Sequence, residues 1–295
     1  MSILLTGATG YIGSSVLPRL LDEGHAVTAL VRDEAKAQLV RDAGASAVVG
    51  DATDSALVSR LARESDGVIH LASAPDVDPV FVAAVLEGLA GSGKPFVHTG
   101  GVWTYGSNPD ITEDSPAAPP AITAWRGANE AVVLGAEGVR GSVVVPSIVY
   151  GHGKGLARVI VDAPRGSGVA PALQLIGDGT QHWATVHVDD VAALYVLALE
   201  NGEAGEVYIA AGGANPTVRE LGELAARAAE VAGGVAPASV EETEERLGAG
   251  LAEALLLDQQ ARGTKARIDL GWEPNGPTLA DEIATGSYAH ELARS

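Results

Sequence analysis

Hydrophobic and polar positions follow two periods through the first half of this 295-residue chain, and together they predict a parallel sheet with helices on both faces. Short apolar runs rich in Val, Ile and Leu end at Gly, Asp or Thr, as buried strands do. Between them, Ala- and Leu-rich segments repeat their apolar positions with the helical period. The strands are predicted within residues 2–6, 26–31, 47–49, 67–72, 95–99 and 142–145, and typical helices over 80–89 and 128–137.

The first apolar run leads directly into a turn with three glycines, and a helix-like segment follows it. Gly7 allows a tight bend, Gly10 lets the backbone approach a ligand, and Gly13 lets the helix pack closely on the sheet. The helix N-terminus then presents free amide groups to an anion. This context favours a dinucleotide pyrophosphate site over a glycine turn without chemical meaning. The residues predicted to bind the cofactor here are Gly7, Thr9, Gly10, Tyr11, Ile12 and Gly13.

The regular pattern loosens after residue 150, where glycine-rich and irregular sequence begins. We therefore expect residues 1–150 to form a dinucleotide-binding domain and residues 151–295 to form mainly a smaller substrate-binding lobe. A well-patterned helix is expected to return to the first domain within residues 186–200, with Asp189 or Asp190 capping its start.

Charge and composition exclude several classes of partner. Asp and Glu total 38 against 19 Lys and Arg, so the formal charge is −19 at pH 7. Such a surface repels nucleic acid and anionic lipid, and neither is expected as a partner. The chain has no cysteine, which excludes disulfides and thiolate metal sites, and no metal site is predicted. Because its apolar runs are short and the first strand begins at once, the expected location is the cytoplasm.

Five stretches in order along the chain carry a family resemblance. Residues 6–13 read TGATGYIG, residues 70–73 read HLAS, and residues 145–151 read VPSIVYG. Residues 186–192 read VHVDDVA and residues 270–274 read LGWEP. Together they resemble the extended short-chain dehydrogenases/reductases, the epimerase/dehydratase-like branch. The resemblance implies an α/β protein with a Rossmann-type, doubly wound parallel sheet and a smaller C-terminal substrate lobe.

The end of the second predicted strand bears on the choice between NADP and NAD. An acidic residue there binds the ribose diol of NAD, whereas an Arg offers a planar charged fork to the 2′-phosphate of NADP. Arg32 favours NADP unless it points to solvent, and Asp33 directly after it leaves NAD open. By resemblance, Asp51 and Ala52 lie at the adenine, although a plain turn aspartate is the competing interpretation. The resemblance also places Leu71, Ala72 and Ser73 along the central ribose and Pro146, Ser147 and Ile148 at the nicotinamide.

The catalytic residues that the resemblance implies are missing. The family has a Ser or Thr after the fifth strand and, on the next helix, a Tyr four residues before a Lys. Alignment puts Gly101, Ile122 and Arg126 at these positions, and none of the four lysines lies between the fifth and sixth strands. A literal Tyr-x-x-x-Lys occurs at Tyr150 and Lys154, but two intervening glycines disfavour a helix there.

A proton donor, if the reaction needs one, must therefore come from elsewhere, either another side chain or water. Arg126 can hold ribose hydroxyls, yet it stays protonated near neutrality. Tyr105 is the first candidate, because the loop after the fifth strand faces the nicotinamide in this family; the alternative is packing under the second lobe. Further candidates are Thr99, Thr104, His98 and His152, of which His98 is better explained as a hydrogen-bonded core residue. Trp103, Trp125 and Trp183 form either an aromatic wall around the substrate or buried packing.

The leading hypothesis is an NADP-dependent oxidoreductase that transfers a hydride to or from a small organic carbonyl, imine or enone. An iminium suits such a site because it already carries the charge that an acid supplies. A catalytically silent NAD(P)-binding sensor is the alternative. A nucleotide-sugar epimerase or dehydratase ranks third, since Arg158, Arg165 and Arg219 would have to converge on a diphosphate. The expected partner is a small-molecule substrate, and the family resemblance is compatible with a homodimer.

Overall fold

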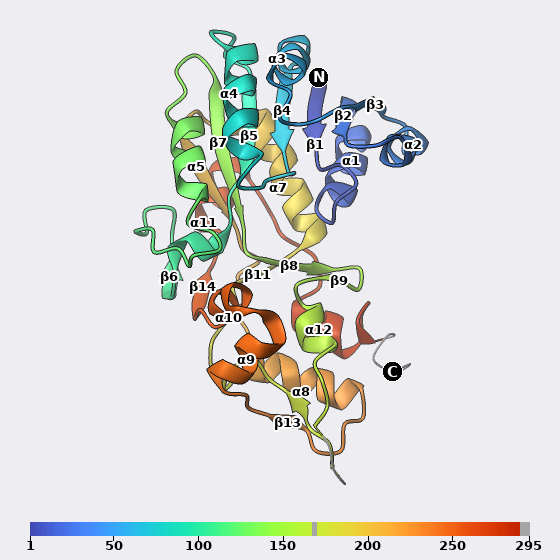
Figure 1. Ribbon diagram of the computed structural model, residues 1–295, viewed down its shortest axis with the longest axis vertical. Coiled ribbons are helices and arrows are strands. Elements are labelled where there is room, and N and C mark those ends of the chain that lie inside the picture. The colour runs from blue at the N-terminus through green and yellow to red at the C-terminus, as the bar shows by residue number, and fades with distance from the viewer. Residues whose placement is uncertain (167–169, 290–295) are drawn as a thin grey trace.

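The computed structural model describes residues 1–166 and 170–289, and at its centre lies a seven-stranded sheet (Figure 1). Its strands are β1 (Ser2–Thr6), β2 (Ala26–Val31), β3 (Ser46–Val49), β4 (Gly67–His70), β5 (Pro95–Thr99), β7 (Arg140–Pro146) and β12 (Glu206–Ala210). They follow the order β12-β7-β5-β4-β1-β2-β3 with every neighbouring pair parallel. Because the chain winds outward from β1 in both directions, ligands are expected at the carboxyl ends of β1 and β4. The predicted Rossmann-type fold is confirmed.

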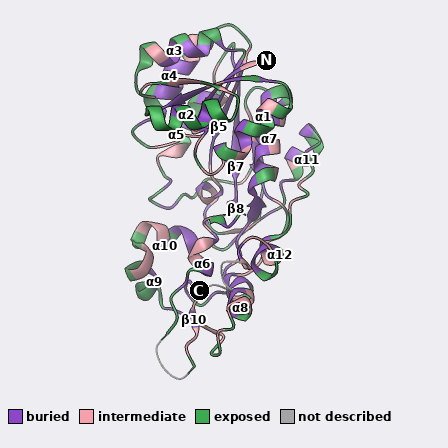
Figure 2. Ribbon diagram, turned by 90° about the vertical axis from the view of Figure 1, so that its right-hand side faces the viewer, coloured by how far each residue is buried: buried purple, intermediate pink, exposed green. Residues whose placement is uncertain are grey.

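Helices cover both faces of this sheet, and β1 shows why. Its alternate side chains point to opposite faces, so Ile3 and Leu5 join one buried cluster and Leu4 joins another. The first cluster packs under α1 (Gly13–Asp22), α2 (Glu34–Asp42) and α7 (Val188–Asn201), and the second under α3 (Ser55–Glu64), α4 (Asp78–Leu89) and α5 (Arg126–Leu134). Figure 2 shows buried strands between helices whose outer sides are exposed. No helix of the described ranges is long and apolar enough to cross a membrane.

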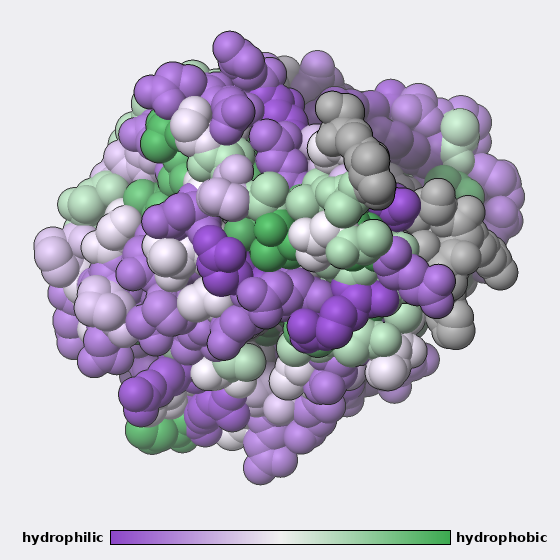
Figure 3. Space-filling model, turned by 90° about the horizontal axis from the view of Figure 1, so that it is seen from below, coloured by the Kyte–Doolittle hydropathy of each residue, from purple (hydrophilic) through white to green (hydrophobic). Residues whose placement is uncertain are grey.

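A second lobe lies below the sheet in Figure 1 and has its own buried cluster, which includes Trp183 and Tyr288. Its strands are β8 (Ile148–Gly151), β9 (Lys154–Gly155), β10 (Leu173–Gln174), β11 (Thr185–His187) and β13 (Val235–Ala236), and its helices are α6 (Arg158–Val161), α8 (Val218–Ala228), α9 (Val240–Leu247), α10 (Ala249–Leu255) and α12 (Leu279–Ala284). Seen from below, this end of the molecule is mostly hydrophilic with small apolar patches (Figure 3).

Four further elements complete the fold. The short strands β6 (Asn108–Ile111) and β14 (Gln259–Ala261) pair in parallel as a separate two-stranded sheet. The one-turn 3-10 helix η1 (Val102–Tyr105) follows β5, and α11 (Thr264–Leu270) packs beside β12 and α7.

Two local expectations can be compared with these elements. The helix expected within 186–200 is α7, which packs on α1 and the sheet. The expected cap by Asp189 or Asp190 is wrong, because His187 precedes the helix and its Nδ1 accepts a hydrogen bond from the Asp189 amide at 3.3 Å. The division at residue 150 stays a prediction. Strand β12 of the main sheet comes from beyond that residue, and the end of the expected lobe, residues 290–295, lies outside the described part of the chain.

Candidate functional site

The glycine turn after β1 has a geometry that only glycine tolerates at two of its positions. Gly7 has φ +72°, and a Cβ on Gly13 would lie 2.0 Å from the Gly7 carbonyl oxygen. The Gly10 amide donates to that same oxygen at 2.9 Å, which closes the turn. The amides of Tyr11, Ile12 and Gly13 make no hydrogen bond to a described residue, and no side chain caps α1. The turn therefore offers unpaired donors at a helix start, where an anion binds well.

A cavity of about 680 Å³ opens beside this turn at the carboxyl ends of β1, β2 and β4. It brings together seven of the residues predicted for the cofactor: Gly7, Thr9, Gly10, Arg32, Asp51, Ala52 and Ala72. Its other walls include Lys36, Thr53 and Asp76. The remaining predicted residues do not line it: Tyr11, Ile12, Gly13, Leu71, Ser73, Arg126, Pro146, Ser147 and Ile148.

At the end of β2 the cavity carries two positive side chains, Arg32 and Lys36. Sequence reasoning missed Lys36, although its spacing of four residues from Arg32 at the start of a helix was a usable signal. Asp33 accepts a hydrogen bond from the Lys36 amide at 2.8 Å and so caps α2. Across the cavity, Asp51 accepts from the amide and the hydroxyl of Thr53, each at 2.8 Å, and these bonds hold its pKa below the usual value. Asp51 is thus a turn aspartate that also lines the cavity.

Arg126 lies at the opposite end of this edge of the sheet, in the first turn of α5. Its Nη1 donates to the Ser73 hydroxyl at 3.0 Å and to the Thr99 carbonyl at 3.1 Å. The guanidinium also lies 4.5 Å from the centre of the Trp125 ring. Its Nε and Nη2 make no hydrogen bond to a described residue, so one edge of the charged fork is without a hydrogen-bond partner in that part of the chain.

The fully buried carboxylate of Asp78 lies at the centre of a cluster of polar side chains next to Arg126. Asp78, in the first turn of α4, accepts from the Ser73 hydroxyl at 2.6 Å, the Ala74 amide at 2.8 Å and His70 Nε2 at 3.2 Å. His98 Nε2 lies 3.4 Å from the same carboxylate. Although burial opposes ionisation, the hydrogen bonds from His70 and Ser73 keep the pKa of Asp78 low.

Both histidines of this cluster are neutral. Burial lowers the pKa of His70, and burial together with neighbouring His70 lowers the pKa of His98 to about 3. His98 is buried, as expected of a core histidine, but its ring has no hydrogen-bond partner among the described residues. The expectation of a hydrogen-bonded histidine is therefore wrong in that respect. His70, Asp78 and His98 also have the residue types of a metal site. Because Asp78 is already saturated with donors and Arg126 adds a nearby positive charge, we assign no ion to them.

A model of the NAD dependent epimerase/dehydratase family matches residues 3–211 of this chain. The chain belongs to that family. The resemblance inferred from the five sequence stretches is therefore confirmed.

Individual relatives cover almost the whole chain. An uncharacterised protein of Schizosaccharomyces pombe is 31% identical over 300 residues, with 98% of this chain and 100% of the relative covered. A 3-diazoavenalumate denitrifying reductase of a Streptomyces species is 26% identical, covering 96% of this chain and 99% of that protein. A dTDP-glucose 4,6-dehydratase double mutant from Streptomyces venezuelae, solved with NAD and DAU bound, has a TM-score of 0.78 at 23% identity and covers 100% of this chain and 98% of that chain. That structure supports the fold.

The structure also places Ile122 and Gly101, the residues expected where the resemblance implies a Tyr and a Ser or Thr. Ile122 precedes α5 and is 43% exposed, while Gly101 precedes η1, and neither carries a hydroxyl. The literal motif does not replace them. Tyr150 lies on β8 and Lys154 on the antiparallel strand β9, and the Tyr150 hydroxyl donates to the Pro277 carbonyl at 2.8 Å.

The candidate proton donors differ in how far their polar atoms are already engaged. The Thr99 hydroxyl donates to the His70 carbonyl at 2.6 Å and lies 2.8 Å from the Tyr195 hydroxyl. Thr104 donates to the Gly101 carbonyl, and His152 pairs with Asp189 at the surface. The Tyr105 hydroxyl has no partner in the described residues. Burial raises the pKa of Tyr105, and the charge of Glu130 adds to this effect.

The remaining candidates are the three tryptophans and the three arginines named for a diphosphate. Trp183 is buried and donates to the Leu255 carbonyl, so the packing interpretation is right for it, whereas Trp103 and Trp125 are partly exposed. Arg158 pairs with Asp162 on α6, and Arg219 donates to the Asp178 carbonyl at the start of α8. The arginines named for a diphosphate thus contact separate parts of the lobe, with Arg165 bridging to Leu173 in a short strand pair.

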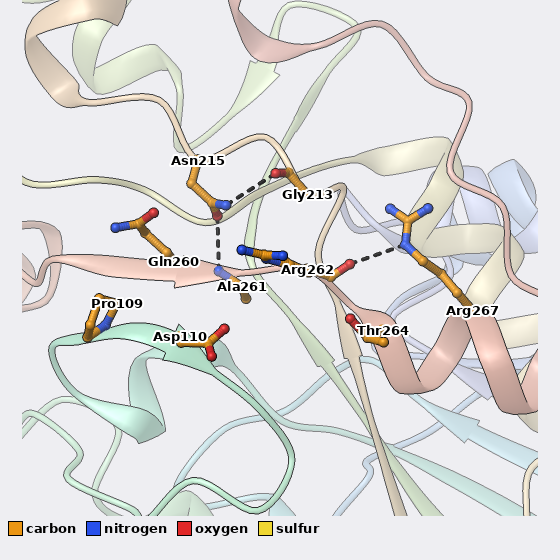
Figure 4. A pocket seen from close by; sticks show the side chains of 9 residues that line it. All are labelled: Pro109, Asp110, Gly213, Asn215, Gln260, Ala261, Arg262, Thr264 and Arg267. Atoms are coloured by element: carbon orange, nitrogen blue, oxygen red, sulfur yellow. Dashed lines mark hydrogen bonds between the residues drawn. The ribbon is translucent and has the colours of Figure 1, made fainter.

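A second cavity, of about 520 Å³, is lined by residues of β6, β14 and α11 and by Gly213 and Asn215 (Figure 4). Arg267 lines it and donates to the carbonyls of Arg262 and Gly212, and the Asn215 side chain accepts a hydrogen bond from the Ala261 amide. None of the residues predicted to bind a cofactor lines this cavity.

Proposed function

We propose that this protein is an NADP-dependent oxidoreductase that delivers a hydride to a small, activated carbon–nitrogen, carbon–oxygen or carbon–carbon double bond. The observation that carries the proposal is the pairing of a dinucleotide-sized cavity with a site that has Arg126 in place of the family lysine and no tyrosine of lowered pKa. Hydride delivery to an activated acceptor needs no strong base, whereas removing a proton from a sugar hydroxyl does.

The preference for NADP rests on charge at the end of β2. Arg32 and Lys36 both line the cavity there and would hold a 2′-phosphate. One side-chain oxygen of Asp33 caps α2 by accepting from the Lys36 amide. Asp33 is therefore less suited to bind the ribose diol of NAD. The pyrophosphate would lie on the unpaired amides of Tyr11, Ile12 and Gly13, with Gly7, Thr9 and Gly10 beside it. The adenine would lie near Asp51 and Ala52.

At the nicotinamide end, the free edge of Arg126 would bind ribose hydroxyls, with residues 71–73 and 146–148 along the cofactor. When bound, NADPH supplies a hydride that reduces the substrate carbon, while the electron pair of the double bond takes up a proton. Tyr105, protonated throughout the neutral range, is the proposed source of that proton for a carbonyl or enone. Thr99, whose hydroxyl is already engaged, would keep the end of β5 in place. A preformed iminium already carries the positive charge that such an acid would provide.

The similarity to a diazo-compound reductase is consistent with reductive chemistry on a nitrogen-containing substrate, though that protein is 26% identical. An NAD(P)-binding sensor is the second candidate, and the raised pKa of Tyr105 is the observation that favours it. For both candidates the expected partner is a small molecule.

The test separates cofactor binding from chemistry. The purified protein is titrated with NADPH and NADH by fluorescence, and then mixed in single turnover with preformed iminium, carbonyl and enone substrates while NADPH absorbance is followed. We expect tighter NADPH binding and oxidation by at least the iminium class. Binding without oxidation across all three classes favours the sensor. Absence of binding to either nucleotide overturns the proposal.

A further inference from the structure

The Arg126 guanidinium is attached to the buried cluster through a single hydroxyl group. Its Nη1 donates to Ser73 Oγ at 3.0 Å, and Ser73 Oγ in turn donates to Asp78 at 2.6 Å. Ser73 is partly buried, whereas Asp78 is fully buried beneath it. The neighbours of Ser73 on both sides, Ala72 and Ala74, line the dinucleotide cavity. The link therefore lies at the edge of the proposed cofactor site.

The direction of each hydrogen bond in this network is fixed by the chemistry of its members. An arginine has no acceptor, so Ser73 Oγ must accept from Arg126 and donate its own hydrogen to the carboxylate. On the other side of Asp78, the ionised carboxylate can only accept, so His70 Nε2–H donates to it at 3.2 Å. The neutral ring then accepts at Nδ1, which lies 2.7 Å from the Thr6 hydroxyl. Thr6 lies at the end of β1, directly before the glycine turn. The network thus runs from the glycine turn through His70, Asp78 and Ser73 to Arg126.

A second carboxyl group, that of Glu130, also lies near Arg126 and differs from Asp78 in its hydrogen bonding. Glu130 follows Arg126 by one helical turn on α5, but its Oε1 is buried without a hydrogen-bond partner, and burial raises its pKa. Asp78 is the carboxylate that reaches Arg126 through hydrogen bonds, and its low pKa keeps it charged. A charge-assisted chain with defined polarity orients a guanidinium better than an unbonded charge does.

We propose that Asp78 is a positioning residue for the cofactor, which acts through the Ser73 hydroxyl to hold Arg126 with its free Nε and Nη2 edge toward the nicotinamide ribose. This inference rests on the proposed function, because it assigns Arg126 to the cofactor. Held in this way, the guanidinium loses little side-chain entropy on binding, since the fork is oriented before the ligand arrives.

The test is a double-mutant cycle on NADPH affinity. Ser73→Ala removes the link while leaving the Ala74 and His70 bonds to Asp78, and we expect about tenfold weaker binding, a typical value for a charge-assisted hydrogen bond. Asp78→Asn should weaken binding to a similar extent. Ser73→Thr retains the hydroxyl and should restore most of the affinity. Glu130→Gln, the matched control, removes the carboxyl that has no hydrogen bond to Arg126 and should change binding less than about threefold.

The decisive comparison uses Arg126→Met as the second background. If Ser73 acts through Arg126, Ser73→Ala should cost little further affinity once Arg126 is gone. Equal losses in both backgrounds overturn the inference, as does an unchanged NADPH affinity in Ser73→Ala. Thermal unfolding of each variant checks that it is folded. If Asp78→Asn does not fold, the Ser73→Ala result alone decides between the outcomes. A wild-type protein that fails to bind NADPH refutes the proposed function instead, which distinguishes the two failures.

Discussion

The two ends of the proposed cofactor site are built in different ways. At the glycine turn, the shape is set by main-chain sterics within residues 6–13, and the donors are backbone amides. At the Arg126 end, the shape is set by side chains from separate elements, joined through a buried carboxylate. The first end depends on the absence of side chains and the second on their charge and polarity. The two ends should therefore respond to different perturbations.

Gly13→Ala should have the largest effect, because the new Cβ would lie 2.0 Å from the Gly7 carbonyl oxygen. The turn and α1 must move apart, at a cost of about 3 kcal/mol in unfolding free energy. Since the same amides are proposed to hold the pyrophosphate, we expect NADPH and NADH affinity to fall about 100-fold or more. Fluorescence titration and denaturant unfolding measure the two quantities.

Gly127→Ala is the matched control for this variant. Gly127 lies in α5 beside Arg126, and a Cβ there would meet nothing within 4 Å. It should keep cofactor affinity and gain about 1 kcal/mol of stability or less, from helix propensity. If Gly13→Ala binds NADPH as well as Gly127→Ala does, the glycine turn is not the pyrophosphate site.

Acid should destabilise the Arg126 end, where buried histidines lie. The glycine turn should be insensitive to pH, because its amides do not titrate. The folded protein holds His98 neutral down to about pH 3, because burial lowers its pKa. The unfolded chain protonates this residue near its usual pKa of about 6.5. Between these values the unfolded state binds more protons, so stability is lost as the pH falls from about 6.5 toward 3. The expected loss is a few kcal/mol over this window.

Denaturant unfolding at a series of pH values measures that slope. His98→Phe keeps a flat ring without a titratable group, and its stability should fall less steeply over the same window. The lowered pKa of His70 acts in the same sense and leaves a residual slope in that variant. Gly127→Ala adds no titratable group and should follow the wild-type slope. Parallel curves for His98→Phe and the wild type would contradict the assignment.

The same contrast explains what the sequence could predict. The sheet, the glycine turn and the cavity residues Gly7, Thr9, Gly10 and Arg32 follow from patterns within short stretches, where spacing fixes geometry. The other three cavity residues, Asp51, Ala52 and Ala72, come from the family resemblance. Asp78 could not be found in that way, since nothing in its local sequence indicates that His70, His98 and Ser73 surround it. The wrong cap at α7 has a similar origin. Aspartate is the commoner capping residue, but the backbone places His187 at that point.

Substitutions at the end of β2 should have a smaller effect, and one confined to the 2′-phosphate of NADPH. Arg32→Ala should weaken NADPH binding about 10- to 100-fold, the value of one lost charge-assisted contact, and Lys36→Ala by less. NADH affinity should stay within about threefold of the wild type, because NADH lacks the 2′-phosphate. Lys154→Ala removes a lysine that lines a different cavity and serves as the control. Equal losses for both nucleotides would mean that Arg32 contacts a shared part of the cofactor.

The smallest effect is expected from Tyr105→Phe with a preformed iminium substrate. Because burial and Glu130 raise the pKa of Tyr105, its phenol holds its proton tightly and is a weak acid. An iminium needs no proton during hydride transfer, so single-turnover NADPH oxidation should change less than about threefold. A carbonyl substrate does need one, and its rate should fall by about 100-fold if Tyr105 is the donor. An equal loss for both substrates would show that Tyr105 shapes the site instead of supplying a proton, and the proton would then have to come from solvent.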